Sequence, residues 1–572
     1  MTIAVIVTVM LIVLFGAGIA GGERKRNNGF LQKIQTEYGK KAAVRHTPEE
    51  LRRIAFYSES RIRGEKTENV TDDITWNDLG MDRIFDDMDV TYSSAGEEYL
   101  YHILRTPCVR EEELREREKV IRFFTENKDV REKLQLEFAR IGKSSRISLA
   151  EYLQKLTMID GRDRMIYRLP VVMLTASVIW GILMPRVGII VMVAVIFLNI
   201  FLYYFWDSGE LKPYLEALGY VRRAVYGLGR VRKYLSGDLE QYGSRFGENY
   251  DRIRRLFRGS GILSGNSASK SPGDALLDYV RVVTHLDVIK FYRMAGGLRT
   301  CREETGVLLD TIGFLDSMAA VSSYRCALPY WCVPTFRTGA ESGICFSAEK
   351  EYHPLVKDPV ANSVKADRGM LVTGSNASGK STFLKTTALC AVLAQTIHTC
   401  PAVSCSGSMY RICTSMALRD DLAAKESYYI VEIKSLKRIL EYVDGRIPVL
   451  CFIDEVLRGT NTIERIAASA QILKSLSRPG VICTAATHDI ELAKLLEPYY
   501  DNYHFQEKIV EDDVQFDYHL YPGPSSSRNA IKLLEIIGYD RTITQWAEFS
   551  AEHFLETGEW SLENPEHDPE TR

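Results

Sequence analysis

Several kinds of site are missing from this 572-residue sequence. Its 11 cysteines include no Cys-x-x-Cys pair and no Cys/His group at zinc spacing, which indicates reduced thiols in a cytosolic environment and no structural metal. The net charge of -3 means that no overall field attracts nucleic acid, so any such binding must be local.

Length and composition are those of a folded protein with several parts. Apolar residues make up 46% and charged residues 26% of the chain, which excludes a mostly disordered or fibrous protein. A chain of 572 residues exceeds what one hydrophobic core usually holds, so we expect two to four domains.

The first 20 residues carry no charge, and the segment Gly-Gly-Glu-Arg-Lys-Arg follows them directly. A secretory signal would place its positive charges before the apolar run and end at a small-residue cleavage site. The reversed order favours a membrane anchor over residues 1–20.

A second apolar tract extends from Leu169 to Trp206 and is interrupted only by Pro185 and Arg186. It is too long for one span of about 20 residues, so it predicts a helical hairpin. Both flanks are basic, which places them in the cytoplasm and makes residues 1–20 a span from outside to inside. The alternative is a pair of buried core helices. The flanking basic residues are Arg162, Arg164, Arg168, Lys212, Arg222 and Arg223.

Patterning divides the chain into seven segments. Apolar residues at three-to-four-residue spacing indicate amphipathic helices on both sides of the hairpin, and later short apolar runs alternate with helical patterns, as in a parallel sheet covered by helices. The expected segments are an anchor at 1–20, a juxtamembrane connector at 21–75, helices at 76–168, the transmembrane hairpin at 169–206, helices at 207–340 with a linker at 259–273, an α/β domain at 341–540 and a C-terminal tail at 541–572.

The middle of the chain is locally basic. This charge is compatible with a nucleic-acid path, or with the positive-inside bias and attraction to anionic lipid. No aromatic residues interleave to stack on bases. The residues are Arg222, Arg223, Arg230, Arg232, Lys233, Arg252, Arg254, Arg255 and Arg258.

A phosphate-binding loop is encoded between Met370 and Thr382, where the sequence reads M-L-V-T-G-S-N-A-S-G-K-S-T. An apolar strand precedes the motif and a helical pattern follows it, as a P-loop requires. Loop glycines let backbone N–H groups point at phosphate oxygens. Lys380 is expected to reach the β- and γ-phosphates and Ser381 to ligate Mg2+. The expected ATP-binding residues are Gly374, Ser375, Asn376, Ala377, Ser378, Gly379, Lys380, Ser381 and Thr382.

Two later strands end in residues suited to ATP hydrolysis. The apolar run 449–453 leads into Asp454 and Glu455, at the edge of the sheet where ligands bind. We expect Asp454 to hold Mg2+ through water and Glu455 to act as general base. The run 481–487 leads into His488, which is suited to contact the γ-phosphate. Glu455, Lys380 and His488 are therefore the candidate catalytic residues of a Mg2+-dependent ATPase.

These motifs resemble one branch of P-loop ATPases, the MutS mismatch-repair family. The loop T-G-S-N-A-S-G-K-S-T-F-L-K is similar to the family's T-G-P-N-M-G-G-K-S-T-x-L-R, and A-V-L-A-Q with C-P-A follows, as in the family. The stretch from Glu426 to Glu432 resembles E-S-T-F-x-x-E, and Asp454 to Thr462 resembles D-E-x-x-R-G-T-S-T, with Asn461 at a serine or alanine position. Tyr352-His353-Pro354, Thr487-His488 and Tyr521-Pro522-Gly523 are similar to further family elements.

The resemblance implies an ABC/MutS-type ATPase domain preceded by an all-α core or lever domain, joined here to about three transmembrane helices. It also implies a homodimer with composite ATP sites, in which Ser427 reaches the nucleotide of the partner subunit. The protein would be a multi-pass membrane protein with a cytoplasmic ATPase domain, in contact with membrane lipid.

Other parts of the family pattern are not recognisable. The sequence shows no mismatch-reading domain with a Phe-x-Glu wedge, no clamp insertion and no nuclease-like C-terminal domain. We therefore expect a membrane-anchored member of the family without direct mismatch recognition. Two functions stay open: an ATPase that binds DNA at the membrane, or a mechanochemical switch that acts on a protein partner without DNA.

Overall fold

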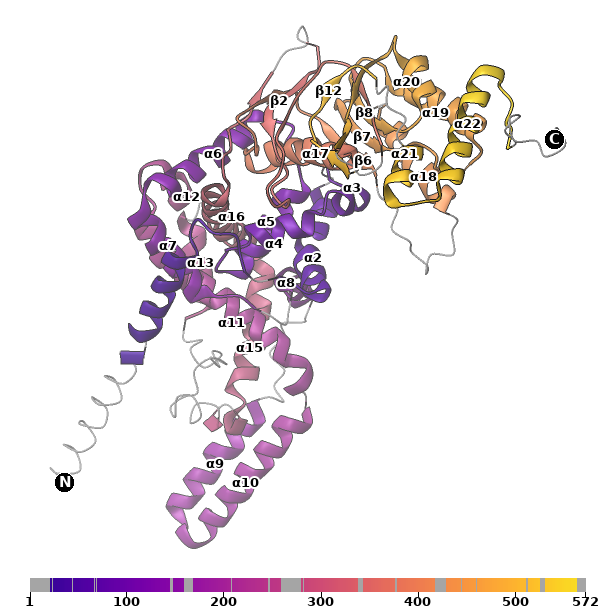
Figure 1. Ribbon diagram of the computed structural model, residues 1–572. Helices are drawn as coiled ribbons and strands as arrows, with labels where there is room; N and C mark the ends of the chain where they lie inside the picture. Colours follow the sequence, from indigo (N-terminus) through magenta and orange to yellow (C-terminus); the bar gives the residue numbers. More distant parts are fainter. Residues whose placement is uncertain are drawn as a thin grey trace. The chain divides into compact units, whose positions relative to one another are not determined.

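The computed structural model divides into two compact units, seen with their elements in Figure 1. The helical unit comprises Met1–Glu68, Asp82–Thr106 and Arg115–Pro329; the sheet unit comprises Asn69–Met81, Pro107–Leu114 and Tyr330–Arg572. The structure describes residues 21–22, 24–43, 45–65, 67, 69–144, 148–158, 168–206, 208–244, 247–258, 279–280, 282–337, 343–375, 378–416, 428–443, 445–458, 460–510, 513–524 and 530–562.

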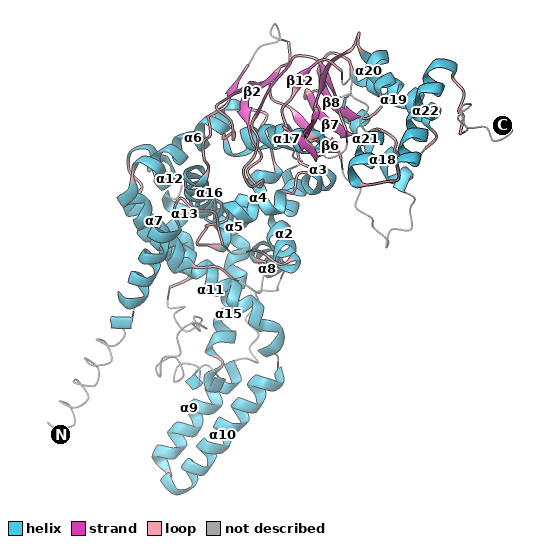
Figure 2. Cartoon of the chain, viewed as in Figure 1, coloured by secondary structure: helices cyan, strands magenta, loops and turns pink. Residues whose placement is uncertain are grey.

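Helices account for the regular structure of the helical unit, and Figure 2 shows the strands gathered in the sheet unit. Residues 24–37 are helical. The further helices are α2 (Pro48–Glu65), α4 (Met81–Met88), α5 (Ser94–Arg105), α6 (Glu111–Glu126), α7 (Lys128–Ile141), α8 (Leu149–Met158), α9 (Leu169–Leu183), α10 (Pro185–Trp206), α11 (Ser208–Val231), η2 (Arg232–Tyr234), η3 (Gly237–Leu239), α12 (Glu240–Ser244), α13 (Gly247–Leu256), α15 (Leu286–Thr300) and α16 (Arg302–Ala327).

Helices α5 and α16 cross at close range in the core of the helical unit. A Cβ atom on Gly96 would lie 2.3 Å from a carboxylate oxygen of Asp316, and one on Gly313 would lie 2.6 Å from the carbonyl oxygen of Ala95. The buried Asp316 carboxylate accepts hydrogen bonds from the backbone N–H and the hydroxyl of Ser93, the N-cap of α5, at 2.8 and 2.6 Å. These hydrogen bonds hold the N-terminus of α5 against α16.

Helices α9 and α10 form an antiparallel hairpin that the apolar tract of residues 169–206 encodes. Their backbones meet closely beside the turn, where a Cβ atom on Gly188 would lie 2.3 Å from the Cα of Gly181. Asn199 is buried and donates to the carbonyl oxygens of Pro170 and Val283, both at 3.0 Å. Close packing at the two glycines and the hydrogen bonds of the Asn199 side chain therefore stabilise the hairpin.

Two described helices are long and apolar enough to cross a membrane. In Pro185–Phe205, within α10, only 11% of the apolar window is buried, whereas the figure for α16 is 78%. The first is exposed as a lipid-facing helix would be, and the second is a core helix of the helical unit. The shorter α9 has 15 residues. The expected anchor at 1–20 lies outside the described residues, so three spans remain an expectation.

A six-stranded sheet forms the centre of the sheet unit, with strand order β12-β9-β4-β8-β7-β6. The five strands from β9 to β6 are parallel, and β12 joins the edge antiparallel. These strands are β4 (Gly369–Thr373), β6 (Arg411–Ser415), β7 (Val449–Asp454), β8 (Val481–Thr487), β9 (Tyr500–His504) and β12 (Tyr521–Pro522). Strands β4, β7 and β8 are buried along their whole length, as central parallel strands should be.

Smaller sheets and helices complete the sheet unit. A second sheet has the order β1-β5-β2-β3, and β10 pairs with β11. The remaining strands of the sheet unit are β1 (Thr335–Phe336), β2 (Phe346–Glu351), β3 (Asn362–Ala366), β5 (Ser404–Gly407), β10 (Glu507–Val510) and β11 (Asp513–Phe516). Its helices are α3 (Asp73–Asp78), α17 (Lys380–Ile397), α18 (Tyr428–Val443), α19 (Thr462–Leu476), α20 (Ile490–Leu496), α21 (Ala530–Ile537) and α22 (Arg541–Thr557).

Part of the expected C-terminal tail is helical. Asp540 caps α22 by accepting a hydrogen bond from the backbone N–H of Thr542 at 2.8 Å, and the helix ends at Gly558 in the left-handed conformation. Asp540 and Gly558 are thus regular N-terminal and C-terminal caps of this helix. Residues 563–572 lie outside the described part of the chain.

Candidate nucleotide site

The phosphate-binding loop joins β4 to α17 and turns at two glycines. Gly374 and Gly379 have φ values of 144° and 109°, a region that side chains disfavour. A Cβ atom on Gly374 would also lie 2.8 Å from the carbonyl oxygen of Phe505. Gly379 is the N-cap of α17, so the free N–H groups of this helix open directly onto the loop.

Lys380 is buried inside the loop that precedes it. Its ammonium group donates to the carbonyl oxygens of Gly374 at 2.8 Å and Ser375 at 2.6 Å. Burial lowers the pKa of Lys380 to about 8, against the opposing effect of the nearby Glu455 and Asp454 carboxylates. The loop therefore holds one cationic group close to the N-terminus of α17.

Two hydroxyl groups of the loop differ in how they are satisfied. Ser381 Oγ donates to Asp454 Oδ2 at 2.6 Å, which joins the start of α17 to the end of β7. Ser378 Oγ is buried and has no hydrogen-bond partner among the residues that the structure describes. A buried polar atom without a partner is costly, so Ser378 fits a loop that hydrogen-bonds an oxygen-rich ligand.

Glu455 follows β7 in a left-handed turn, with φ of 58°. One carboxylate oxygen lies 2.6 Å from His488 Nε2, at the end of the adjacent strand β8, and the other accepts from Arg458 Nε at 2.7 Å. The hydrogen bond to His488, and then Arg458, hold the pKa of Glu455 below its usual value. Glu455 is thus ionised at neutral pH beside the phosphate-binding loop.

Glu432 on α18 braces the turn that presents Glu455. Its buried carboxylate accepts from the backbone N–H groups of Leu457 at 2.5 Å and Arg458 at 3.1 Å. Leu457 has a φ of 61°, an uncommon value for a residue with a large side chain. The two charge-assisted hydrogen bonds stabilise this strained turn.

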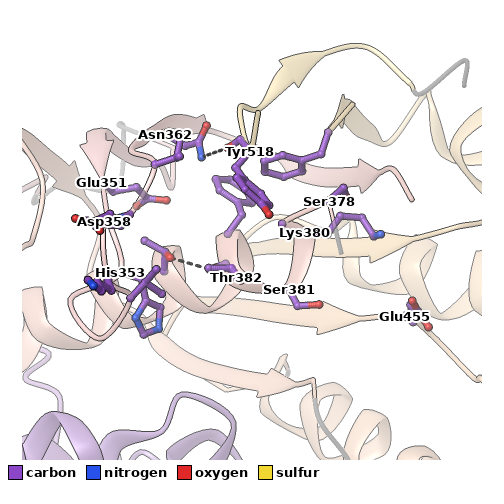
Figure 3. A pocket seen from close by; sticks show the side chains of 18 residues that line it. Glu351, His353, Asp358, Asn362, Ser378, Lys380, Ser381, Thr382, Glu455 and Tyr518 are labelled. Carbon is purple, nitrogen blue, oxygen red and sulfur yellow. Dashed lines mark hydrogen bonds between the residues drawn. The ribbon is translucent and has the colours of Figure 1, made fainter. Parts of the chain in front are cut away.

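A pocket of about 500 Å³ opens beside the loop and is shown in Figure 3. Tyr518 lies between Asn362 and the phosphate-binding loop. Asn362 holds this segment with two hydrogen bonds: its amide donates to the carbonyl oxygen of Tyr518, and its side-chain oxygen accepts from the N–H of Leu520, both at 2.9 Å. A Cβ atom on Gly379 would lie 3.2 Å from the Tyr518 ring. One wall of the pocket is therefore an aromatic ring next to the loop.

The pocket also contains a buried carboxyl group. Glu351 at the end of β2 lines the pocket and contacts the hydroxyl of Thr387 on α17. Burial raises the pKa of Glu351 to about 8, so the group is largely protonated at neutral pH. Glu351 therefore adds little negative charge to the pocket at neutral pH.

The structure brings most of the expected site residues together. Ser378, Gly379, Lys380, Ser381, Thr382 and Glu455 line one pocket, and Asp454 and His488 contact two of them. Ser375 lies in the same loop and contacts Glu507. Asn376, Ala377 and Ser427 lie outside the described residues. Sequence reasoning did not identify Asn362, Tyr518 or Glu351, because no motif marks residues that converge only through the fold.

The fold and this site define a P-loop ATPase-type domain, and comparisons with known proteins place it more closely. Residues 370–555 match the family described as MutS domain V. The DNA mismatch repair protein MutS of Natronomonas pharaonis is 28% identical over 288 residues, 47% of this chain and 32% of the relative. The protein of the same name from Thermus thermophilus is 33% identical over 200 residues, 34% of this chain and 24% of the relative.

Residues 370–555 are therefore a domain of the MutS domain V type, and the chain is similar to MutS proteins over part of its length. The matched part covers less than a third of the length of either relative. Outside the matched domain, the sequence predicts mainly helices. The structure agrees in general terms, because the chain is largely helical and its strands form mixed sheets.

Proposed function

We propose that the protein binds ATP and hydrolyses it to ADP and phosphate in a Mg2+-dependent reaction. The observation that carries this proposal is the convergence of Lys380, the Ser381–Asp454 pair and the Glu455–His488 pair around one pocket. These groups come from three neighbouring strand ends, and each has a charge that matches one part of the reaction.

In the proposed mechanism, each of these residues has one task. The ammonium group of Lys380 donates to phosphate oxygens in place of the loop carbonyls, and the Ser378 hydroxyl, which has no partner among the described residues, bonds a phosphate oxygen. Glu455 accepts a proton from the water that attacks the γ-phosphorus, and the bond to the β–γ bridging oxygen breaks to release ADP. His488 orients the Glu455 carboxylate by its contact with one oxygen.

The residues present fit a magnesium ion. Ser381 Oγ at the start of α17 and Asp454 at the end of β7 supply the hydroxyl and carboxylate oxygens that this ion prefers. Bound there, Mg2+ would neutralise charge on the transferred phosphoryl group. Asp454 would hold it through water.

We further propose that the aromatic side of the pocket receives the adenine base. Tyr518 offers a ring face beside Gly379, and the volume of about 500 Å³ suits a nucleoside attached to the phosphates in the loop. Asn362 then acts as a positioning residue, because it holds the Tyr518 segment rather than the base.

The proposed assembly is a homodimer with composite ATP sites, to which Ser427 of each subunit contributes in trans. Support comes from the resemblance of residues 426–432 to the family signature and from the position of Glu432, which lies under the Glu455 turn. Closure of the dimer on ATP and its release after hydrolysis would make the nucleotide a switch.

For the helical unit, we propose membrane tethering through residues 1–20 and the α9–α10 hairpin, with the ATPase domain in the cytoplasm. DNA is the proposed ligand, in line with the similarity to DNA mismatch repair proteins. The second candidate is a membrane protein partner on which the ATPase acts without DNA, and the exposed apolar face of α10 favours it.

DNA-dependent ATPase activity separates the two candidates. The full chain, purified in detergent, is assayed for MgATP hydrolysis with and without linear and branched duplex DNA. Stimulation that decreases steeply as salt rises supports the DNA candidate. An unchanged rate across all DNA forms contradicts it and favours the protein partner, while the absence of any MgATP hydrolysis contradicts the enzymatic proposal itself.

A further inference from the structure

Five of the seven residues that line a pocket of about 440 Å³ in the helical unit are arginines. They come from three helical segments. Arg26 belongs to the helix of residues 24–37, Arg140 to the end of α7, and the others to α11. The residues of α11 are Arg222, Arg223, Tyr226 and Arg230, and Asn27 completes the lining.

The pocket is built by helix spacing and by side-chain contacts. Positions 222, 226 and 230 recur every four residues and therefore share one face of α11. Arg140 Nε donates to Asn27 Oδ1 at 3.1 Å, which joins α7 to the helix of residues 24–37. Arg223 Nε donates to the carbonyl oxygen of Ile141 at 2.7 Å, which joins α11 to α7. These contacts fix the three walls relative to one another.

Positive charge in this pocket is only partly balanced. Within the described chain, no acidic side chain lines it. Glu137, buried behind the lining, accepts from Arg230 Nε at 2.5 Å and also pairs with Arg140. Burial lowers the pKa of Arg222 and Arg223, so water screens these charges less than it does on an open surface. A bound anion would reduce the electrostatic repulsion among these arginine side chains.

Phosphate is the anion that suits this geometry. Guanidinium groups present planar pairs of N–H donors that match phosphate oxygens, and several of them around one cavity can bind a single phosphate from different sides. A volume of about 440 Å³ has room for one phosphate group and its substituents, whereas a duplex requires an extended row of phosphate contacts.

We propose that this arginine pocket binds the phosphate headgroup of an anionic phospholipid from the cytoplasmic leaflet. The proposal rests on the membrane tethering proposed above. Arg26 follows the uncharged residues 1–20 by six positions. The headgroup layer is roughly 5 to 8 Å thick, and six residues of helix rise about 9 Å, so Arg26 would mark the membrane-facing rim of the pocket.

The arginines of α11 would lie farther from the membrane than Arg26, because Arg222 is 16 positions beyond Trp206, where the hairpin ends. A headgroup would therefore enter from the side of the helix of residues 24–37. Bound lipid would join this helix, α7 and α11, and so connect the two membrane-directed parts of the helical unit.

Native mass spectrometry of the detergent-purified full chain tests this site. The probes are dioleoyl phosphatidylglycerol, dioleoyl phosphatidylcholine and inorganic pyrophosphate, each titrated separately. The test variant is Arg26→Gln/Arg222→Gln, and the matched control is Arg254→Gln/Arg255→Gln, which removes the same charge from exposed positions of α13 outside the pocket.

We expect phosphatidylglycerol to bind the test variant roughly 30-fold more weakly than the wild-type protein, and the control variant with wild-type affinity. Phosphatidylcholine, which has no net charge, should bind weakly to all three. Equal phosphatidylglycerol affinity in the wild-type protein and the test variant would overturn the proposal. Binding of pyrophosphate that the test variant loses, without a lipid difference, would overturn lipid as the source of the phosphate.

Three further measurements separate this proposal from the proposed function and from nucleic-acid binding. Lys380→Ala should lose MgATP hydrolysis and keep phosphatidylglycerol binding, so the ATPase and lipid proposals can fail independently. Wild-type protein that stays in solution without detergent would contradict the tethering, and with it the lipid site. A 20-base-pair duplex whose binding depends on Arg26 and Arg222, with no lipid difference, would assign the pocket to nucleic acid and overturn the proposal.

Discussion

Glu432→Gln tests whether the turn after β7 controls hydrolysis. The substitution keeps the size of the side chain but replaces one of its two acceptor oxygens with an NH2 group. The carboxylate now accepts from the N–H groups of Leu457 and Arg458, so the amide can satisfy only one of them. The other donor is left facing a second donor in a buried position.

The cost can be estimated from these two contacts. Loss of one charge-assisted hydrogen bond costs about 1.5 to 3 kcal/mol, and an unsatisfied buried donor adds about 1 to 3 kcal/mol. Relaxation of the strained turn at Leu457 would recover part of this energy. If a net cost of roughly 1.5 to 3 kcal/mol falls on the active position of Glu455, kcat decreases about 10- to 100-fold.

Steady-state MgATP hydrolysis and equilibrium binding of ATP to the full chain measure this effect. We expect kcat to fall and the Kd for ATP to change by less than about threefold, because Glu432 does not line the nucleotide pocket. Glu441→Gln removes an exposed carboxylate from the same helix and serves as control. A Glu432→Gln protein with wild-type kcat would refute the role assigned to the turn, as would a loss of ATP binding at unchanged kcat.

Three other outcomes follow from the structure. Asn362→Ala should weaken ATP binding about tenfold at nearly constant kcat, because two hydrogen bonds that hold the Tyr518 segment are lost; an unchanged Kd argues against a base site there. Lys380 has a pKa of about 8, so it loses its proton as pH rises, and ATP affinity should fall about tenfold between pH 7 and 9; a flat profile of Kd against pH contradicts this. Gly96→Ala should destabilise the helical unit by about 1 to 3 kcal/mol, measured by denaturant unfolding, since its Cβ would overlap a buried carboxylate. Gly306→Ala, which meets open space on α16, is the control and should not destabilise.

Much of the nucleotide site is readable from the sequence because its residues are tied to local structure. The backbone of the loop requires glycine at 374 and 379. Asp454 is the last residue of β7, and the five residues before it are all apolar. Parallel pairing then brings β7 and β8 together, so that Glu455 and His488 meet. Each of these relations depends on strand ends sharing one edge of the sheet.

Other features depend on contacts between distant segments, which no local pattern reports. Asn362 and Tyr518 are 156 positions apart and meet only through the fold. The arginines of the basic pocket are likewise spread along the sequence from Arg26 to Arg230, and only the fold brings them together around one pocket. For the two long apolar helices, hydropathy and burial agree: the mean hydropathy is 2.5 in Pro185–Phe205 and 1.2 in α16, and the more apolar helix is the exposed one.

The measurement that tests the central claim most directly compares Glu455→Gln with the wild-type protein in two assays, equilibrium binding of MgATP and its single-turnover hydrolysis. If Glu455 accepts the proton of the attacking water, the variant binds MgATP with an affinity within a few-fold of wild type and hydrolyses it at least about 100-fold more slowly. Equal hydrolysis by the two proteins would remove Glu455 as the base. Failure of the wild-type protein to bind MgATP would contradict the nucleotide site itself.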